Sequence, residues 1–192
     1  MKYEFKYLKD LSAEEIKNLV DIRYRNTLGV FVHFVGDITI FPQEKGNWID
    51  VACAEDVVLP PSHFTFEDPP YGNIKISLGF SMKLPKGYEA HLAPRSGTFS
   101  KYGIIQTNGV GIVDNSYCGT NDIWMMPVFS LGAHTLIPKG TRIAQFRFMP
   151  TMETEMFTAP SPAKFYNEPT IVFIICDELE SVDRGGFGST GI

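Results

Sequence analysis

The sequence predicts an all-β fold, in the form of a sandwich, jelly roll or barrel, on three observations. Short β-like runs recur about every 8–12 residues, and each run is bounded by Gly, Pro, Asn or Asp. The chain contains 17 Gly and 13 Pro residues, which favour turns, and 15 Phe residues, which favour strands. Its 192 residues are enough for one domain with a substantial hydrophobic core.

Most of the chain is expected to form strands. Residues 3–7 alternate aromatic and charged side chains, which is a strand pattern. Residues 29–41 are expected to form one interrupted strand or two short ones, and residues 171–176 a last strand or short core segment. Further short strands are expected at 55–60, 74–80, 87–92, 103–106, 122–130, 134–138 and 141–149.

One helix and two irregular segments interrupt this pattern. Ser12 and Glu15 have the spacing of a capping box, and the apolar positions that follow predict a helix over about 12–24. Residues 150–169 are rich in Pro, Thr and Glu and are expected to form a covering loop. The last residues, 184–192, contain too many glycines to hold a regular element. We therefore expect a single β domain over 1–183, followed by a flexible arm over 184–192.

Composition excludes several classes of protein. The net charge of −5 argues against a general nucleic-acid binder. The four histidines are scattered without ligand spacing, and the three cysteines are odd in number and far apart, which suits free thiols in a reducing compartment. No apolar run reaches about 18 residues, so we expect no membrane partner and a cytoplasmic protein.

The segment from Gly109 to Gly119 is predicted to form a hairpin that approaches a ligand. Its Ile-Val pair favours a strand, and the Asp-Asn-Ser sequence that follows favours a turn. The glycines allow a flat polar ligand to reach the backbone. Asp114 and Tyr117 are then expected at the tip. Read alone, the segment also fits an ordinary surface hairpin.

Four other stretches carry groups that suit a phosphorylated ligand. The sequence Pro94-Arg95-Ser96-Gly97 offers a guanidinium, a hydroxyl and backbone amides to phosphate. Gln145 can donate to an oxyanion, and Asp50 can serve a hard cation through water. In the glycine-rich tail, Phe187 can stack on a base. Each stretch alone also fits an ordinary turn, a structural ion pair or a solvent-exposed end.

Taken together, four of these motifs resemble the trimeric dUTPases. They are residues 94–97, 111–119, 140–145 and 185–191, and they occur in the order of that family. The resemblance implies a β-clip or distorted jelly-roll subunit in a homotrimer with active sites between chains. It also implies hydrolysis of dUTP to dUMP and pyrophosphate with Mg²⁺, which limits uracil in DNA and supplies dUMP for dTMP synthesis.

The resemblance also assigns roles around the hairpin. Asp114 would activate the water that attacks the α-phosphate. Tyr117 would lie against the deoxyribose and exclude a 2′-hydroxyl. Asn108 and the backbone around Gly111 would recognise uracil. Hydrolysis of a phosphate mainly requires such positioning together with charge neutralisation, which agrees with these assignments.

Further roles follow from the same resemblance. Asp50 would steady the magnesium through water, although Trp48 stands where the family has glycine. The tail would close over a site on a different subunit, with Phe187 stacked on uracil. Arg184 directly precedes the Gly-Gly pair, whereas the family's tail arginine stands further upstream. The remaining substrate contacts would come from Arg95, Ser96, Gly97, Gln145, Arg184, Gly188 and Ser189.

Two alternatives stay open at this point. The first is a dCTP deaminase on the same fold, but that family places a glutamate where this chain has Trp124. The second is a nucleotide-binding regulatory protein with weak turnover, in which the 12–24 helix or the 150–169 loop binds a partner.

Overall fold

The computed structural model describes residues 2–20, 27–59, 73–131, 135–152 and 170–186. The described residues are mostly strands, which confirms the all-β prediction. The helices are α1 (Ala13–Val20), α2 (Thr98–Tyr102) and a 3₁₀ turn at Leu8–Asp10. The strands are β1 (Lys2–Tyr7), β2 (Thr27–Phe34), β3 (Ile40–Phe41), β4 (Ile49–Ala52), β5 (Val57–Leu59), β6 (Asn73–Ser77), β7 (Phe80–Lys83), β8 (Tyr88–Pro94), β9 (Ile104–Gln106), β10 (Gly111–Val113), β11 (Met125–Ser130), β12 (Thr135–Ile137), β13 (Arg142–Pro150) and β14 (Thr170–Ile175).

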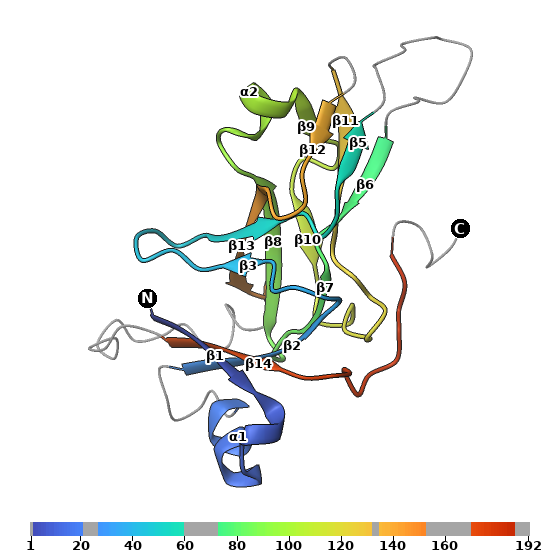
Figure 1. Cartoon of the computed structure of the whole chain (residues 1–192). Coiled ribbons are helices and arrows are strands. Elements are labelled where there is room, and N and C mark those ends of the chain that lie inside the picture. Colours follow the sequence, from blue (N-terminus) through green and yellow to red (C-terminus); the bar gives the residue numbers. More distant parts are fainter. Residues whose placement is uncertain (1, 21–26, 60–72, 132–134, 153–169, 187–192) are drawn as a thin grey trace.

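The strands form sheets that are stacked along the molecule. A five-stranded sheet with the order β10-β8-β13-β4-β3 occupies its middle (Figure 1). The four-stranded sheet β1-β14-β2-β7 lies at the end that carries α1. The sheets β6-β11-β9 and β12-β5 lie at the opposite end with α2. The middle sheet is the important one for function, because β10, β13 and β4 carry predicted site residues and Arg95 directly follows β8.

The N-terminal helix begins where the capping box predicts. Ser12 N–H donates to Glu15 Oε2 at 2.9 Å, and Glu15 N–H donates to Ser12 Oγ at 3.3 Å. The hydrogen bonds from Ser12 also lower the pKa of the Glu15 carboxyl. The helix packs on β2 at Gly29, where a Cβ atom would lie only 2.7 Å from the Leu19 carbonyl oxygen. The expected end of the helix, residues 21–24, lies outside the described residues.

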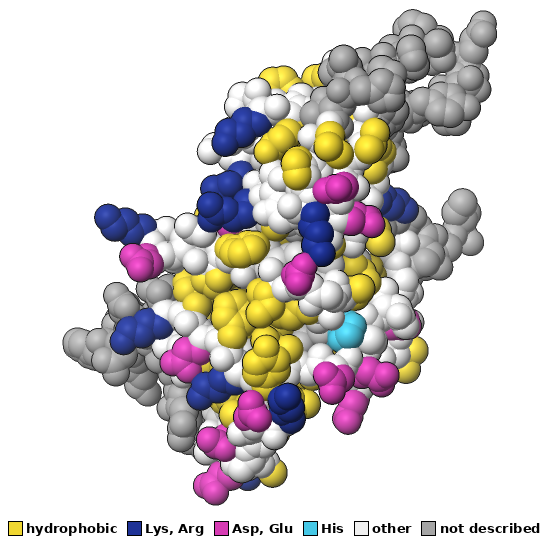
Figure 2. Space-filling view, viewed as in Figure 1, with side chains coloured by type: hydrophobic (Ala, Val, Ile, Leu, Met, Phe, Trp, Pro, Cys, Tyr) yellow, Lys and Arg dark blue, Asp and Glu magenta, His cyan; other side chains and the backbone are white. Residues whose placement is uncertain are grey.

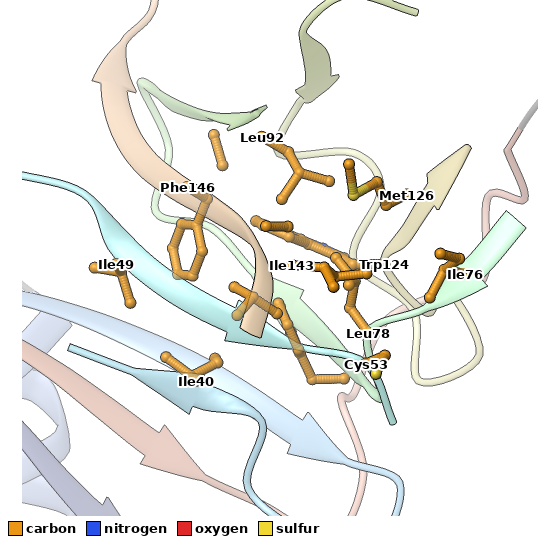
Figure 3. Packing of buried hydrophobic residues seen from close by; sticks show 14 of the residues in the cluster. Ile40, Ile49, Cys53, Ile76, Leu78, Leu92, Trp124, Met126, Ile143 and Phe146 are labelled. Atoms are coloured by element: carbon orange, nitrogen blue, oxygen red, sulfur yellow. The ribbon is translucent and has the colours of Figure 1, made fainter. Parts of the chain in front are cut away.

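The core is built around three aromatic rings that sequence reasoning had placed on different strands. The Trp124 ring centroid lies 4.9 Å from that of Phe80 and 5.3 Å from that of Phe146. All three side chains are almost fully buried. Figure 3 shows Trp124 and Phe146 among the aliphatic side chains of the neighbouring strands. This cluster fixes the position of Trp124, which directly precedes β11. It therefore also anchors the chain that follows the predicted hairpin.

The predicted hairpin differs from the structure in its pairing. The turn forms as expected, since Tyr117 N–H donates to Asp114 O at 3.2 Å. The strand before the turn, β10, pairs with β8, and no returning strand pairs with it in the described chain. The reason is that the chain after Gly119 binds the C-terminal segment and then enters the core at Trp124. The strand expected over 122–130 accordingly begins only at Met125.

One predicted segment can be placed only in part. The covering loop expected at 150–169 is described only as far as Met152, and the rest lies outside the described residues.

Cys53, Cys118 and Cys176 are all free thiols. Among the described residues, no helix has the length and apolar character needed to cross a membrane.

Candidate active site

A pocket of about 330 Å³ lies beside β10 and the turn that follows it. Five of the predicted site residues line it, together with the beginning of the C-terminal arm. Apolar groups from the core form its floor, so the pocket combines an apolar surface with a few polar groups, as small-molecule sites generally do. The lining residues are Leu92, Asn108, Gly111, Ile112, Val113, Asp114, Tyr117, Trp124, Met125, Arg184, Gly185 and Gly186.

Asp114 is held as an ionised carboxylate at the mouth of this pocket. Partial burial acts to raise its pKa, but hydrogen bonds from Ser116 and the charge of Arg184 outweigh this effect and lower the pKa. The Ser116 N–H donates to Oδ1 at 2.8 Å, and the Ser116 hydroxyl donates to the same oxygen. Arg184 Nη1 donates to Oδ2 at 2.6 Å. Asp114 is therefore available as a base.

Tyr117 stands beside Asp114 as a neutral phenol. Its hydroxyl donates to the Ile123 carbonyl oxygen at 3.0 Å, which fixes the orientation of the ring. Burial raises the pKa of the phenol, and the negative charges of Asp122 and Asp183 raise it further. The ring is thus a rigid wall of the pocket, and at Gly186 it leaves so little room that a Cβ atom would lie 3.2 Å from Tyr117 Cε2.

Asn108 presents an oriented amide near Gly111. Gln106 Nε2 donates to Asn108 Oδ1 at 2.9 Å and to the Leu92 carbonyl oxygen at 3.1 Å. Because its oxygen is occupied, Asn108 has its amino group left to donate to a ligand. Gln106 was missed by sequence reasoning. The signal was present, since a glutamine stands at an inward-facing position of a short apolar strand.

The predicted phosphate-binding residues line a second pocket, of about 270 Å³. Gln145 Nε2 donates to the Pro94 carbonyl oxygen at 3.1 Å, and its second amide hydrogen can still donate to a phosphate oxygen. Gly97 lines an adjoining basic pocket with Lys101 and Arg142. The lining residues of the second pocket are Gln43, Lys45, Gly46, Asn47, Trp48, Asp50, Arg95, Ser96 and Gln145.

Asp50 acts in this structure as a counter-ion for two arginines. Its buried carboxylate lies 3.0 Å from Arg95 Nε through Oδ1 and 3.3 Å from Arg142 Nη1 through Oδ2. Both oxygens are thus engaged with guanidinium groups. In the described part of the chain, no group of three or more His, Cys, Asp or Glu side chains could hold a metal ion. These residues do not fit a magnesium ion held by protein ligands alone.

The two sets of predicted residues line different pockets of the chain. The residues assigned to uracil, sugar and catalysis line the first pocket, and those assigned to phosphate line the other two. The first pocket shares no lining residue with the second or third. Phe187, Gly188 and Ser189 lie outside the described residues.

The C-terminal arm begins differently from the prediction. The expected flexible segment starts at residue 184, but hydrogen bonds to Asp122 hold the N–H groups of Arg184 and Gly185. The physical reason is the buried carboxylate of Asp122, which binds the arm locally. Arg184 to Gly186 line the first pocket in this chain, and the expected closure of the arm over a different subunit stays a prediction.

The fold and the pockets together define a class of protein. The ionised aspartate and fixed tyrosine line one pocket and the arginine, serine and glutamine side chains line another, which suits an all-β enzyme that hydrolyses a phosphorylated ligand. A model of the dUTPase family matches residues 50–166. The chain belongs to the dUTPase family.

Individual relatives agree with this assignment. The chain is 42% identical over 148 residues to the SPbeta prophage-derived deoxyuridine 5′-triphosphate nucleotidohydrolase YosS of Bacillus subtilis, covering 77% of this chain and 86% of that protein. The fold is similar to that of the Streptococcus mutans dUTPase, with a TM-score of 0.53 and 18% identity over 63% of this chain and 95% of the other.

A second solved structure is similar in fold. It is a point mutant of the dUTPase from phage phi11 of S. aureus, with a TM-score of 0.51 and 18% identity. The match covers 64% of this chain and 90% of the other. That structure is described as revealing the coordination of a structural Mg(II) ion.

Proposed function

We propose that this protein hydrolyses dUTP to dUMP and pyrophosphate. The observation that carries the proposal is the first pocket, where the ionised Asp114, the fixed Tyr117 ring and the oriented Asn108 amide line one cavity. The proposal is supported by the names of the relatives, which describe deoxyuridine 5′-triphosphate nucleotidohydrolases. The reaction removes dUTP, and so limits uracil in DNA, and it supplies dUMP.

Uracil recognition rests on fixed polar groups in the pocket. The Asn108 amino group donates to a carbonyl oxygen of the base, and backbone groups around Gly111 complete the pairing. A base with an amino group in place of that carbonyl leaves the Asn108 donor unpaired, which costs about 1–3 kcal/mol per buried group. The rigid Tyr117 ring lies against deoxyribose and leaves no room for a 2′-hydroxyl.

The chemical step uses Asp114 as the general base. An Asp114 oxygen accepts a proton from a water that is aligned with the α-phosphate, and the leaving group is pyrophosphate. Oδ1 is held by Ser116, so Oδ2 is the oxygen that accepts this proton. Arg184 occupies Oδ2 in the present structure. The negative triphosphate attracts the Arg184 guanidinium away from Oδ2, and this makes room for the water.

We assign phosphate binding and the contact with magnesium to the residues that line the second and third pockets. Arg95, Ser96, Gly97 and Gln145 hold the triphosphate. Magnesium arrives bound to the triphosphate oxygens as part of the substrate, since magnesium often takes few protein ligands. Asp50 positions Arg95, and its oxygens would hold a magnesium ion only through water, where the ion would neutralise phosphate charge.

The active unit in this proposal is a homotrimer with sites between chains. The separation of the two sets of residues supports it, because Asp114 needs the phosphate-binding residues of another copy. Figure 2 shows hydrophobic side chains gathered on one face of the molecule, over the middle sheet and over the strands near β5 and β12. Val58 and Leu136 face each other across β5 and β12 and are more than half exposed. Such surfaces suit burial against other copies of the chain.

The remaining parts of the proposal concern location and the alternative activity. Three free thiols suit a cytoplasmic enzyme. The dCTP deaminase alternative is not favoured, because the position of its glutamate is taken by Trp124, which is 1% exposed and packed between Phe80 and Phe146.

One experiment tests the proposed function. Pyrophosphate release is measured with dUTP, dCTP, dTTP, dATP, dGTP and UTP in the presence of magnesium, and ammonia release is measured with dCTP. We expect fast release from dUTP, at least a hundredfold slower release from the others and no ammonia. Comparable turnover of dUTP and dCTP would contradict the uracil assignment.

A further inference from the structure

The loop between β3 and β4, residues 42–48, forms one wall of the second pocket. We call it the β3–β4 loop. The two strands pair antiparallel, with Phe41 opposite Asp50, so the loop is a hairpin connection, and Figure 1 shows it projecting from the middle sheet. The loop supplies more than half of the residues that line the pocket. They are Gln43, Lys45, Gly46, Asn47 and Trp48, and they lie against Asp50, Arg95, Ser96 and Gln145.

Local interactions give this loop a defined course. Gln43 Nε2 donates to the Phe41 carbonyl oxygen at 3.0 Å, which folds the start of the loop back on β3. Gly46 has φ of 101°, in the left-handed region that a glycine adopts without strain. The loop therefore turns at Gly46 and brings Lys45 and Trp48 to the same pocket.

Trp48 is held in place by Arg147. The Arg147 guanidinium carbon lies 5.7 Å from the centroid of the Trp48 ring, a cation–π contact. Arg147 and Gln145 are two positions apart on β13, so their side chains point to the same face of the sheet. The Trp48 ring is thus fixed on the side of β13 from which Gln145 reaches the pocket. Because the family has glycine at this position, the ring is a wall that the resemblance does not supply.

Lys45 brings a positive charge that the protein does not neutralise. Arg95 and Arg142 share the carboxylate of Asp50, at 3.0 and 3.3 Å. Lys45 is exposed, and among the described residues it has no carboxylate within ion-pair distance. Its ammonium can therefore pair with an anion in the pocket, and phosphate oxygens are strong acceptors for such a group.

The position of the loop selects one part of the substrate. The α-phosphate must stay with Asp114, which lines the first pocket, so the β- and γ-phosphates are the part that extends furthest into the second. We propose that the β3–β4 loop binds these terminal phosphates, with Lys45 neutralising their charge and Trp48 shielding them from water. The proposal rests on the proposed function, which places the triphosphate against Arg95, Ser96 and Gln145. Because dUMP lacks both terminal phosphates, the loop distinguishes substrate from product.

The first test measures the Lys45 contact without turnover. Inorganic pyrophosphate, a non-hydrolysable dUTP analogue and dUMP are titrated into the full-length protein by calorimetry, with magnesium present. In Lys45→Gln we expect pyrophosphate and the analogue to bind about fivefold more weakly, as for an exposed ion pair, and dUMP to bind as to wild type. The matched control is Lys86→Gln, an exposed lysine that lines none of the three pockets. Wild-type pyrophosphate affinity in Lys45→Gln, or an equal loss for dUMP, would overturn the Lys45 role.

The second test uses Trp48 as its own reporter in the wild-type protein. The chain has two tryptophans, and Trp124 is 1% exposed, so acrylamide quenches mainly the fluorescence of Trp48. Saturating pyrophosphate should lower the quenching constant at least twofold, and Trp48→Phe should lose this response. In Arg147→Gln the ring loses its cation, so quenching without ligand should increase. An unchanged quenching constant in pyrophosphate-saturated wild type would exclude the shielding role, and a wild-type value in Arg147→Gln would exclude positioning by Arg147.

Turnover separates this proposal from the proposed function. Lys45→Gln should raise KM for dUTP about fivefold and leave kcat near wild type, and Lys86→Gln should change neither. If dUTP is hydrolysed but Lys45→Gln changes neither KM nor pyrophosphate affinity, the loop proposal fails and the proposed function stands. If no nucleotide is hydrolysed but pyrophosphate affinity still depends on Lys45, the loop binds phosphate as proposed and the assigned reaction is wrong.

Discussion

The guanidinium of Arg184 lies 2.6 Å from Oδ2 of Asp114, although 70 residues separate them in the chain. The other oxygen of Asp114 is bound by Ser116, so both oxygens have partners before substrate arrives. These hydrogen bonds keep Asp114 ionised while its side chain remains partly exposed. The same ion pair therefore prepares the base and must open for catalysis, which makes Asp114 the first residue to test.

Replacing Asp114 with Asn should lower turnover by roughly 10²–10⁴, the usual effect of removing a general base. Nucleotide affinity should be retained, because the change is nearly isosteric. Pyrophosphate release gives kcat, and calorimetric titration with a non-hydrolysable dUTP analogue gives affinity. Asn115→Ala, an exposed neighbour in the turn, is the control and should keep wild-type turnover. A loss of less than tenfold in Asp114→Asn means that another residue activates the water.

The pKa of Asp114 should depend on Ser116 independently of the arm. Partial burial acts to raise the pKa of Asp114, and the hydrogen bonds from Ser116 lower it because they favour the ionised carboxylate. Ser116→Ala raises that pKa, so the acid limb of kcat/KM moves to higher pH, while kcat at neutral pH stays close to wild type. The depressed pKa also stabilises the folded protein above the unfolded-state pKa of about 3.9, and this contribution is lost as pH falls through the folded value. A shift to lower pH would contradict the assigned hydrogen bond.

Local features of this architecture could be predicted from sequence, and long-range ones could not. The capping box at Ser12 and the turn at Asp114 depend on residues three positions apart, so their chemistry is visible in the sequence. The pairing of β1 and β2 with β14, both parallel, joins segments far apart in the chain. The Arg184 ion pair with Asp114 has the same character. Such contacts depend on the packed core and on the path of the chain, which no local pattern specifies.

The candidate active site likewise contains residues that the sequence predicted and residues that it did not. Asp114, Tyr117 and Asn108 were predicted and line one pocket. Asp122 was missed because its role is created by the C-terminal segment that it binds. Gln106 was missed although its inward-facing position in a short apolar strand was visible in the sequence, because one of its two partners, the Leu92 carbonyl oxygen, lies on another strand.

Gln106 should control base selection rather than stability. Gln106→Leu removes the bond that orients Asn108, so the amide can present either its oxygen or its nitrogen to the base. We expect the ratio of kcat/KM for dUTP over dCTP to fall roughly 10–100-fold, which corresponds to about 1–3 kcal/mol. The substitution removes the hydrogen bond to the Leu92 carbonyl oxygen but also removes the buried, unpartnered Oε1 atom, so the two effects on stability oppose each other and the melting temperature should change little. Thr107→Val at an exposed position is the control, and an unchanged ratio in Gln106→Leu would reject the role.

Asp50 should affect substrate binding through Arg95. In Asp50→Asn, two guanidinium groups lose their shared counter-ion and repel each other, so Arg95 is displaced from the phosphate site. We expect KM for the magnesium–dUTP complex to rise about tenfold, as for other charge-assisted contacts worth about 1.4 kcal/mol. The titration is repeated over a range of magnesium concentrations, and a higher magnesium requirement supports the contact through water. Exposed Glu44→Gln is the control. An unchanged KM in Asp50→Asn would exclude the role through Arg95, and an unchanged magnesium requirement would exclude the contact through water.

The last prediction concerns the separation of the Asp114 pocket from the Arg95 pocket. Because these pockets share no lining residue, a working site should take Asp114 from one chain and Arg95 from another. Light scattering should give a trimer mass at micromolar concentration. Asp114→Asn and Arg95→Gln chains should each be nearly inactive alone. In randomly mixed trimers, about a quarter of the sites combine an intact Asp114 with an intact Arg95, so about a quarter of the wild-type activity should return. Mixing Asp114→Asn with wild-type chains controls for assembly and should retain about half of the activity. If the two inactive variants stay inactive after co-assembly, Asp114 and Arg95 serve the same site from a single chain, and the intersubunit arrangement is wrong.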